Sequence, residues 1–242
     1  MLHIISSTAK KENQGLNNVK RERGENNLAW LARNLPGEAT SIVLVGGKSQ
    51  TSFRLRVAQS HIRNDLLPSY WSHAFLLGKV ESDLGSTTVY EISLEPRQGF
   101  GFPATENGVQ TEKLNRYRSQ RDYPNIAVIK VPVALDAVLD ALKRFQMQRA
   151  VMDAVELILR WLNYCWGVSR AANPLLDNQG IPSSAMLEVV FGAVGYDLTP
   201  GLESRSSCPE AIWQAAKWWH EYYEKQNRDC LTGAYHVGHK LD

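Results

Sequence analysis

The chain has 242 residues, of which 43% are hydrophobic and 21% charged, and its formal net charge is +2. This composition is ordinary for a globular protein, and the near-neutral charge makes no case for nucleic acid as a partner. Three scattered cysteines without paired spacing support neither a disulfide scaffold nor a zinc site. No apolar run approaches the roughly 18 residues of a membrane span, so we expect no transmembrane segment.

The first half of the chain predicts a short helix followed by strands. Residues 1–27 are polar and lack a signal-peptide core, so we expect a flexible arm and synthesis in the cytoplasm. NLAWLARNL predicts an amphipathic helix, and TSIVLVGG predicts a buried strand. SFRLRVAQSHIRNDLL is ambiguous between a helix and a strand followed by a helix. SHAFLLGKV and STTVYEISLEP flank the polar turn ESDLGS and predict a β-hairpin, and NIAVIKVPV predicts a further strand.

The second half of the chain predicts helices. Residues 135–166 have helical periodicity, a second helix follows GIPSS, and a third covers SSCPEAIWQAAKWWHEYYEKQ. Strands in the middle and helices after them indicate an α+β fold rather than a β-α-β alternation. We therefore expect one domain over residues 28–226, with a polar and mobile tail over 227–242.

A histidine and a glutamate on the predicted hairpin are candidates for chemistry. His73 opens an apolar strand, and a histidine is a suitable general base near neutral pH. Glu91 lies within the second apolar strand, where a carboxylate is costly unless it is paired. The turn should bring the two together, so that Glu91 orients His73. A structural histidine and an edge-strand glutamate facing water are the plainer interpretations.

The nucleophile would come from the start of the helix after GIPSS. Ser183 and Ser184 could simply cap that helix, because serine hydroxyls accept hydrogen bonds from free N–H groups there. A nucleophile at the same place would gain from the helix dipole and from N–H groups that bind an oxyanion. Cys165 is a rival nucleophile in a poorer context. Neither a cofactor nor a metal is expected, although His236 and His239 are three residues apart in the tail.

WSHAFLL, VYEISL and SSAMLEVVFGAVGYDLTPG followed by SCPEAIW together resemble the permuted papain-like superfamily. Its members include circularly permuted NlpC-type cysteine peptidases and lecithin:retinol acyltransferase-like enzymes. The resemblance covers residues 42–219. It implies a papain-like fold with a central antiparallel sheet against helices, in which the histidine strand comes first and the nucleophile helix last.

The resemblance also implies roles for individual residues. His73 corresponds to the base, Glu91 to the orienting residue and Ser183 to the position of the catalytic cysteine. We expect Trp71, Ser72 and Ser184 to contact substrate. Serine in place of cysteine leaves three explanations open: an inactivated Cys-to-Ser form, which we favour, a natural pseudoenzyme that only binds, or a working serine nucleophile. A serine hydroxyl is a weak nucleophile at neutral pH, so we expect the chain as given to be nearly inert.

The implied chemistry is hydrolysis of an amide, with bacterial cell-wall peptide (peptidoglycan) as the first choice of substrate. The alternatives are ester hydrolysis in a phospholipid and a pseudoenzyme that binds a partner. By analogy, the chain also looks like a toxic antibacterial effector delivered by contact-dependent (type VI) secretion, with an immunity protein as partner. The aromatic residues from Trp213 to Tyr223 form one stripe opposite charged residues, so we expect most of these rings to be buried and favour the peptide substrate.

Overall fold

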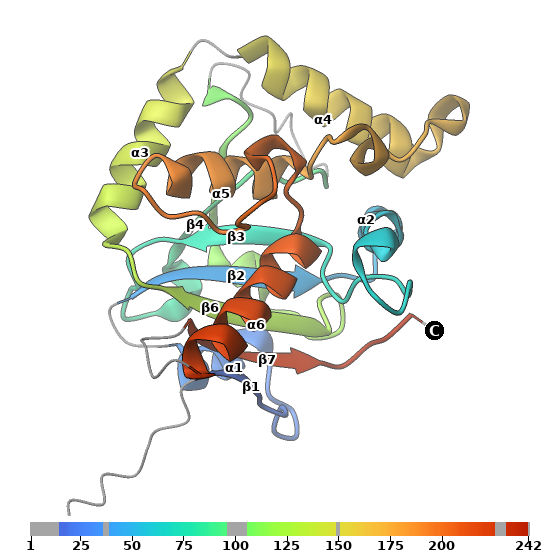
Figure 1. The fold of residues 1–242 in the computed structure, drawn as a ribbon. Helices are drawn as coiled ribbons and strands as arrows, with labels where there is room; N and C mark the ends of the chain where they lie inside the picture. Colours follow the sequence, from blue (N-terminus) through green and yellow to red (C-terminus); the bar gives the residue numbers. More distant parts are fainter. Residues whose placement is uncertain (1–14, 36–38, 96–105, 149–150, 226–230, 242) are drawn as a thin grey trace, which may run out of the picture.

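The computed structural model describes residues 15–35, 39–95, 106–148, 151–225 and 231–241. Within them, seven strands form one mixed sheet in the order β1-β7-β6-β2-β3-β4-β5, and six α-helices surround it (Figure 1). The fold class is therefore α+β, as the sequence predicts. The sheet is antiparallel except for the parallel pair β1–β7.

The elements have the following bounds. The strands are β1 (Leu16–Asn18), β2 (Thr40–Gly46), β3 (His73–Leu77), β4 (Thr88–Glu91), β5 (Gln110–Lys113), β6 (Asn125–Val131) and β7 (Thr232–Val237). The helices are α1 (Asn27–Asn34), α2 (Gln50–Ala58), α3 (Leu135–Met147), α4 (Val151–Trp166), α5 (Pro182–Gly192) and α6 (Pro209–Lys225). Two 3-10 helices matter below, η4 (Leu114–Tyr117) and η7 (Ser204–Ser206).

The sheet separates two hydrophobic cores. On one side, which we call the helical face, Ile42 and Leu44 of β2 pack with residues of α3, α4, α5 and α6. On the other side, the α1 face, Val43 and Val45 pack with Trp30 of α1 and with η4. Successive side chains of a strand point to opposite faces, so the continuous apolar run of β2 is buried on both sides. In Figure 1, α6 crosses in front of the sheet, α5 lies next to β3 and β4, and α1 lies behind the sheet.

Most of the predicted elements are confirmed. NLAWLARNL contains α1, TSIVLVGG contains β2 and NIAVIKVPV contains β6. The predicted hairpin is present: β3 pairs antiparallel with β4 through Leu76–Tyr90 and Leu77–Val89. The first part of the ambiguous segment belongs to the helix α2, and a 3-10 helix over Ser60–Ile62 follows. Helix α2 begins after Ser49, whose hydroxyl accepts a hydrogen bond from the N–H of Ser52.

The two ends of the predicted domain differ from expectation. Residues 232–237 of the supposed mobile tail form β7, which pairs with β6 on one side and β1 on the other. The side chain of Asn125 then holds the backbone of His239 through bonds of 2.8 Å to its N–H and its carbonyl. Part of the supposed arm forms β1, while residues 1–14 lie outside the described part of the chain. These strands were missed because their pairing partners are distant in the sequence.

The aromatic stripe of α6 also differs from expectation. Trp213 is buried against Trp71, but Trp218 is 53% exposed and Tyr222 is 41% exposed. The rings of Trp218 and Tyr222 stack at 5.1 Å, with Trp219 at their edge. Trp219 is partly buried against the core, whereas Trp218 and Tyr222 are exposed, so the expectation that most rings are buried is wrong for the described residues. Among the helices described, none combines the length and hydrophobicity needed to cross a bilayer.

Candidate functional site

His73 and Glu91 form a pair on the α1 face, as the sequence predicts. The imidazole Nε2 lies 2.9 Å from a carboxylate oxygen of Glu91, which is fully buried. Tyr117 of η4 donates its hydroxyl proton to the same oxygen. Although burial alone would raise the pKa of Glu91, the hydrogen bond and charge of His73 outweigh it and keep that pKa below its ordinary value. Glu91 is therefore ionised, and Nε2 of His73 is the donor.

Tyr117 completes this group, and the sequence did not single it out. Burial, followed by the charge of Glu91, raises the pKa of Tyr117 well above its ordinary range, so the phenol stays protonated and donates. Its ring packs 4.6 Å from Phe75 and 6.2 Å from the ring of His73. Its local sequence RYRSQRDYP mixes arginines with tyrosines, and nothing in it signals a buried tyrosine.

The space beside His73 is small. A cavity of about 20 Å³ is lined by His73 and Tyr117 and by hydroxyl groups that include those of Ser52, Ser72 and Ser93. That volume suits about one water molecule. The described residues therefore give His73 an oriented environment and a cavity for about one water molecule.

Ser183 lies on the opposite face of the sheet. Its hydroxyl donates to the carbonyl of Ala74 on β3 at 2.5 Å and accepts from the N–H of Ile92, just after β4, at 3.3 Å. Continuing the β3–β4 register places Ala74 opposite Ile92, beyond the last paired residues. The Ser183 hydroxyl therefore bridges the chain segments of β3 and β4 just beyond the point where the backbone pairing between these strands ends. It is fully buried, with its donor and acceptor functions both used by backbone.

The expectation that the Ser183 hydroxyl and the His73 imidazole lie together in one catalytic site is therefore wrong. Ala74 belongs to the core of the helical face, whereas His73 contacts Phe75 and Tyr117, which belong to the core of the α1 face. The two residues are neighbours in β3, so their side chains must leave the sheet in opposite directions. The structure brings Glu91 to His73 and keeps Ser183 apart from both.

The serines do not cap α5 either. The residue at the N-cap is Ile181, which makes no side-chain capping bond, and Pro182 occupies the first turn. Ser184 is fully buried, and its hydroxyl has no hydrogen-bond partner among the described residues. The start of α5 is positioned instead by backbone contacts of Gly180. Its carbonyl accepts from the indole of Trp161 at 2.7 Å, and its N–H donates to the carbonyl of Arg205 at 2.6 Å.

The remaining candidates are also buried. Trp71 is fully buried, and Ser72 uses its hydroxyl to accept from the N–H of Gly47 and to donate to the carbonyl of Val45. Neither residue is placed to contact a substrate. Burial raises the pKa of Cys165 and of Cys208 to about 12, which makes both thiols poor nucleophiles, and Cys230 lies outside the described residues. The described part of the chain contains no cluster of three or more His, Cys, Asp or Glu side chains suited to a metal ion.

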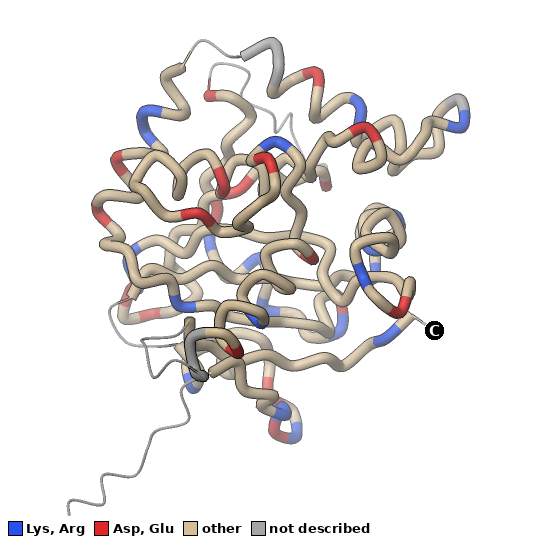
Figure 2. Tube along the Cα trace, in the orientation of Figure 1, with Lys and Arg blue, Asp and Glu red and all other residues tan. Residues whose placement is uncertain are grey.

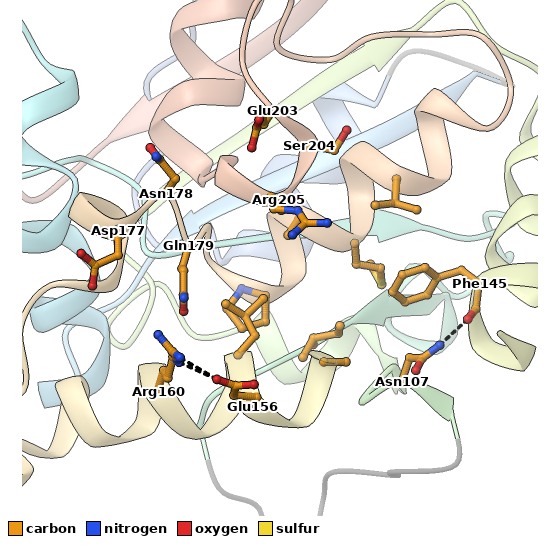
Figure 3. A pocket seen from close by; sticks show the side chains of 17 residues that line it. Asn107, Phe145, Glu156, Arg160, Asp177, Asn178, Gln179, Glu203, Ser204 and Arg205 are labelled. Atoms are coloured by element: carbon orange, nitrogen blue, oxygen red, sulfur yellow. Dashed lines mark hydrogen bonds and ion pairs between the residues drawn. The ribbon is translucent and has the colours of Figure 1, made fainter. Parts of the chain in front are cut away.

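A groove of about 840 Å³ lies on the helical face beside α5 (Figure 3). Its volume is within the range of small-molecule and peptide sites. Apolar side chains of Phe145, Met186 and Val189 line it together with the polar groups of Asn107 and Gln179. Neither His73 nor Ser183 lines it. The sequence did not indicate this groove, because its residues come from segments that are separated by long stretches of chain.

Two residues that line the groove each carry a buried amide oxygen. These oxygens, on Asn107 and Gln179, have no hydrogen-bond partner among the described residues. Asn107 is only 1% exposed, and its Nδ2 donates to the carbonyls of Phe145 and Gln148 at 2.5 and 3.0 Å. Each of the two oxygens has less than 1 Å² of accessible surface, so both are enclosed by protein and do not open into the groove.

Charges elsewhere on the chain are mixed. Acidic and basic residues are interspersed along the trace, in keeping with the net charge of +2 (Figure 2).

Comparison with known protein families and with curated proteins finds no match. The groove and the His73–Glu91 pair are therefore the features from which function can be inferred.

Replacing Ser183 by alanine should destabilise the fold. The change leaves the Ala74 carbonyl and the Ile92 N–H buried without partners, and we expect the free energy of unfolding to fall by about 2 kcal/mol or more. Chemical denaturation measures the effect. Ser184→Ala is the matched control, because it removes an equally buried but unpartnered hydroxyl from the next position and should cost little. Equal losses for the two variants would contradict the bridging role of Ser183.

Replacing Glu91 by glutamine should change how stability depends on pH. The lowered pKa means that ionised Glu91 stabilises the native state above its unfolded pKa, and that this contribution is lost as the pH falls through the folded pKa. We expect Glu91→Gln to lower the free energy of unfolding by about 1–3 kcal/mol at neutral pH. The deficit should shrink on acidification. Glu81→Gln, at an exposed position, should show no such convergence.

Proposed function

We propose that this chain is a non-catalytic, papain-like binding protein that holds an amide-containing ligand in the groove beside α5. The observation that carries the proposal is the groove itself, about 840 Å³ in volume and lined by the apolar side chains of Phe145, Met186 and Val189. A peptide suits such walls because its side chains supply apolar surface. Bacterial cell-wall peptide, which the sequence resemblance suggests, is our first choice of ligand.

The papain-like assignment is part of this proposal. It is supported by the chain order of a histidine strand, an acidic strand and then a helix that begins Pro182-Ser183-Ser184 and lies against the first of these strands. Hydrolysis is not supported, because the Ser183 hydroxyl is bound to backbone and faces away from His73. The phospholipid alternative gains little from the exposed Trp218–Tyr222 pair, since neither ring lines the groove.

Filling the groove should abolish binding. Val189 is 39% exposed and lines the groove, so a tryptophan there occupies ligand space without entering the core. We expect Val189→Trp to weaken the binding of stem peptides released from purified peptidoglycan by about tenfold or more, measured by isothermal titration calorimetry. Val168→Trp is the matched control, because Val168 is similarly exposed at 45% but lies outside the groove. Equal affinities for the two variants would contradict binding in the groove.

Ser183→Cys should not create a hydrolase. The thiol would point toward Ala74 and Ile92 on the helical face, away from the His73 imidazole that would have to deprotonate it. We expect no release of new amino groups from peptidoglycan above that of the unmodified chain, with an active amidase as positive control. Circular dichroism shows whether the variant is folded. Turnover that is lost on adding His73→Ala would overturn the non-catalytic reading.

A further inference from the structure

The segment that follows β7 is held to the body of the domain by two side chains. It runs from β7 toward α2 (Figure 1), and we refer to residues 238–241 as the C-terminal strap. Asn125 at the start of β6 accepts hydrogen bonds from the N–H groups of Gly238 and His239 at 3.0 and 2.8 Å, and its amide donates to the His239 carbonyl at 2.8 Å. Arg56 of α2 donates to the same carbonyl at 3.1 Å.

Arg56 is a buried cation. Its side chain is fully enclosed, and it forms no ion pair with the described residues. Burial, followed by the charge of Arg63, lowers the pKa of Arg56 to about 10, so the guanidinium is still charged at neutral pH. Its Nε donates to the Ser69 carbonyl at 2.6 Å, and both of its other nitrogens bond to His239. The strap therefore supplies acceptors that a buried charge requires.

The contact between Arg56 and the His239 ring selects one protonation state. Nδ1 of His239 lies 3.2 Å from a guanidinium nitrogen of Arg56. An arginine side chain only donates hydrogen bonds, so Nδ1 must accept and cannot carry a proton. A protonated ring donates from both nitrogens and would place a second positive charge against the guanidinium. Docking of the strap is therefore stabilised while the histidine is neutral and is lost as the pH falls through the range in which histidine gains a proton.

The charged groups around this contact do not reverse the effect. Lys240, the next residue of the strap, adds a positive charge. Arg63 is close enough for its charge to lower the pKa of Arg56. The carboxylates nearest to Arg63 are engaged by it, with Asp65 at 2.5 Å and Glu210 at 3.6 Å. Protonation of the histidine thus adds charge to a region that already holds an unpaired guanidinium.

Two further titratable side chains lie nearby. The ring of Tyr70 is 4.4 Å from the Arg63 guanidinium. His236 of β7 approaches the strap, since a Cβ on Gly238 would lie 3.2 Å from its Nε2. Burial, followed by the charge of Arg21, lowers the pKa of His236 below its ordinary value. Any experiment on the strap must therefore separate His239 from this second histidine.

We infer that the C-terminal strap is a pH-sensitive latch, docked on α2 and β6 at neutral pH and released on mild acidification when His239 takes up a proton. Release removes the bonds from Arg56 and Asn125 to His239, and it turns an enclosed guanidinium into an accessible one. The inference does not depend on the proposed function, because neither the strap nor Arg56 lines the groove.

Hydrogen exchange of the full chain, followed by NMR, tests the latch. The amides of Gly238 and His239 report docking, because both donate to Asn125. We expect their protection factors, corrected for the intrinsic rate, to fall about tenfold or more between about pH 7.5 and about pH 5. The Gly233 amide is the internal control, since it donates to the Gly15 carbonyl within the sheet at 3.0 Å and should keep its protection.

Two variants separate the histidines. His239→Gln should abolish the pH dependence, because a glutamine oxygen accepts from Arg56 and does not titrate, whereas His236→Gln should preserve it. An unmodified chain whose strap is no more sensitive to pH than Gly233, or a His239→Gln chain with the original pH dependence, would overturn the latch. If the glutamine strap is unprotected at both pH values, the ring resonances of His239 in the unmodified chain decide. Their titration must share its midpoint with opening of the strap, and different midpoints would overturn the inference.

Discussion

The strict alternation of side chains along β3 governs the functional interpretation of this protein. His73 and Ala74 are consecutive, so one must face η4 and the other must face α5. Glu91 and Tyr117 hold the imidazole on the α1 face, and Ser183 contacts the carbonyl of Ala74 from the helical face. The sheet itself therefore stands between the base and the serine. A one-residue change of register would exchange these faces, but β2 pairs with β3 through five residues and buries apolar side chains on both sides.

The buried polar residues that look catalytic in the sequence have structural explanations. Ser183 satisfies two backbone groups where the β3–β4 ladder ends, which would otherwise be costly inside a core. The carboxylate of Glu91 can be buried away from water because it accepts hydrogen bonds from His73 and Tyr117. Gly180 has no side chain because a Cβ there would lie 2.3 Å from the carbonyl oxygen of Ser207. That close approach joins η7 to the start of α5 and so places Arg205 at the groove.

The groove follows from this packing. α3, α4 and α5 cover one half of the helical face, and Asn107 ties the chain after β4 to the end of α3. The result is an apolar wall between two helix ends of opposite polarity. Neither Ser183 nor His73 lines this groove, so the groove supports binding rather than the cleavage that the sequence assigns to those two residues.

Local sequence patterns determined the elements that depend on near neighbours. The apolar run of β2, the hairpin of β3 and β4 with its turn, the helical spacing of α1 and α5, and the partnership of His73 with Glu91 could all be predicted. Only the tertiary structure decided which face each side chain occupies, because strand register depends on β2 and β6, far away in the chain. The same holds for β7, for Tyr117 and for the groove residues Asn107 and Arg205. Each of these acquires its role through a contact with a distant segment, and no spacing within its own segment encodes that contact.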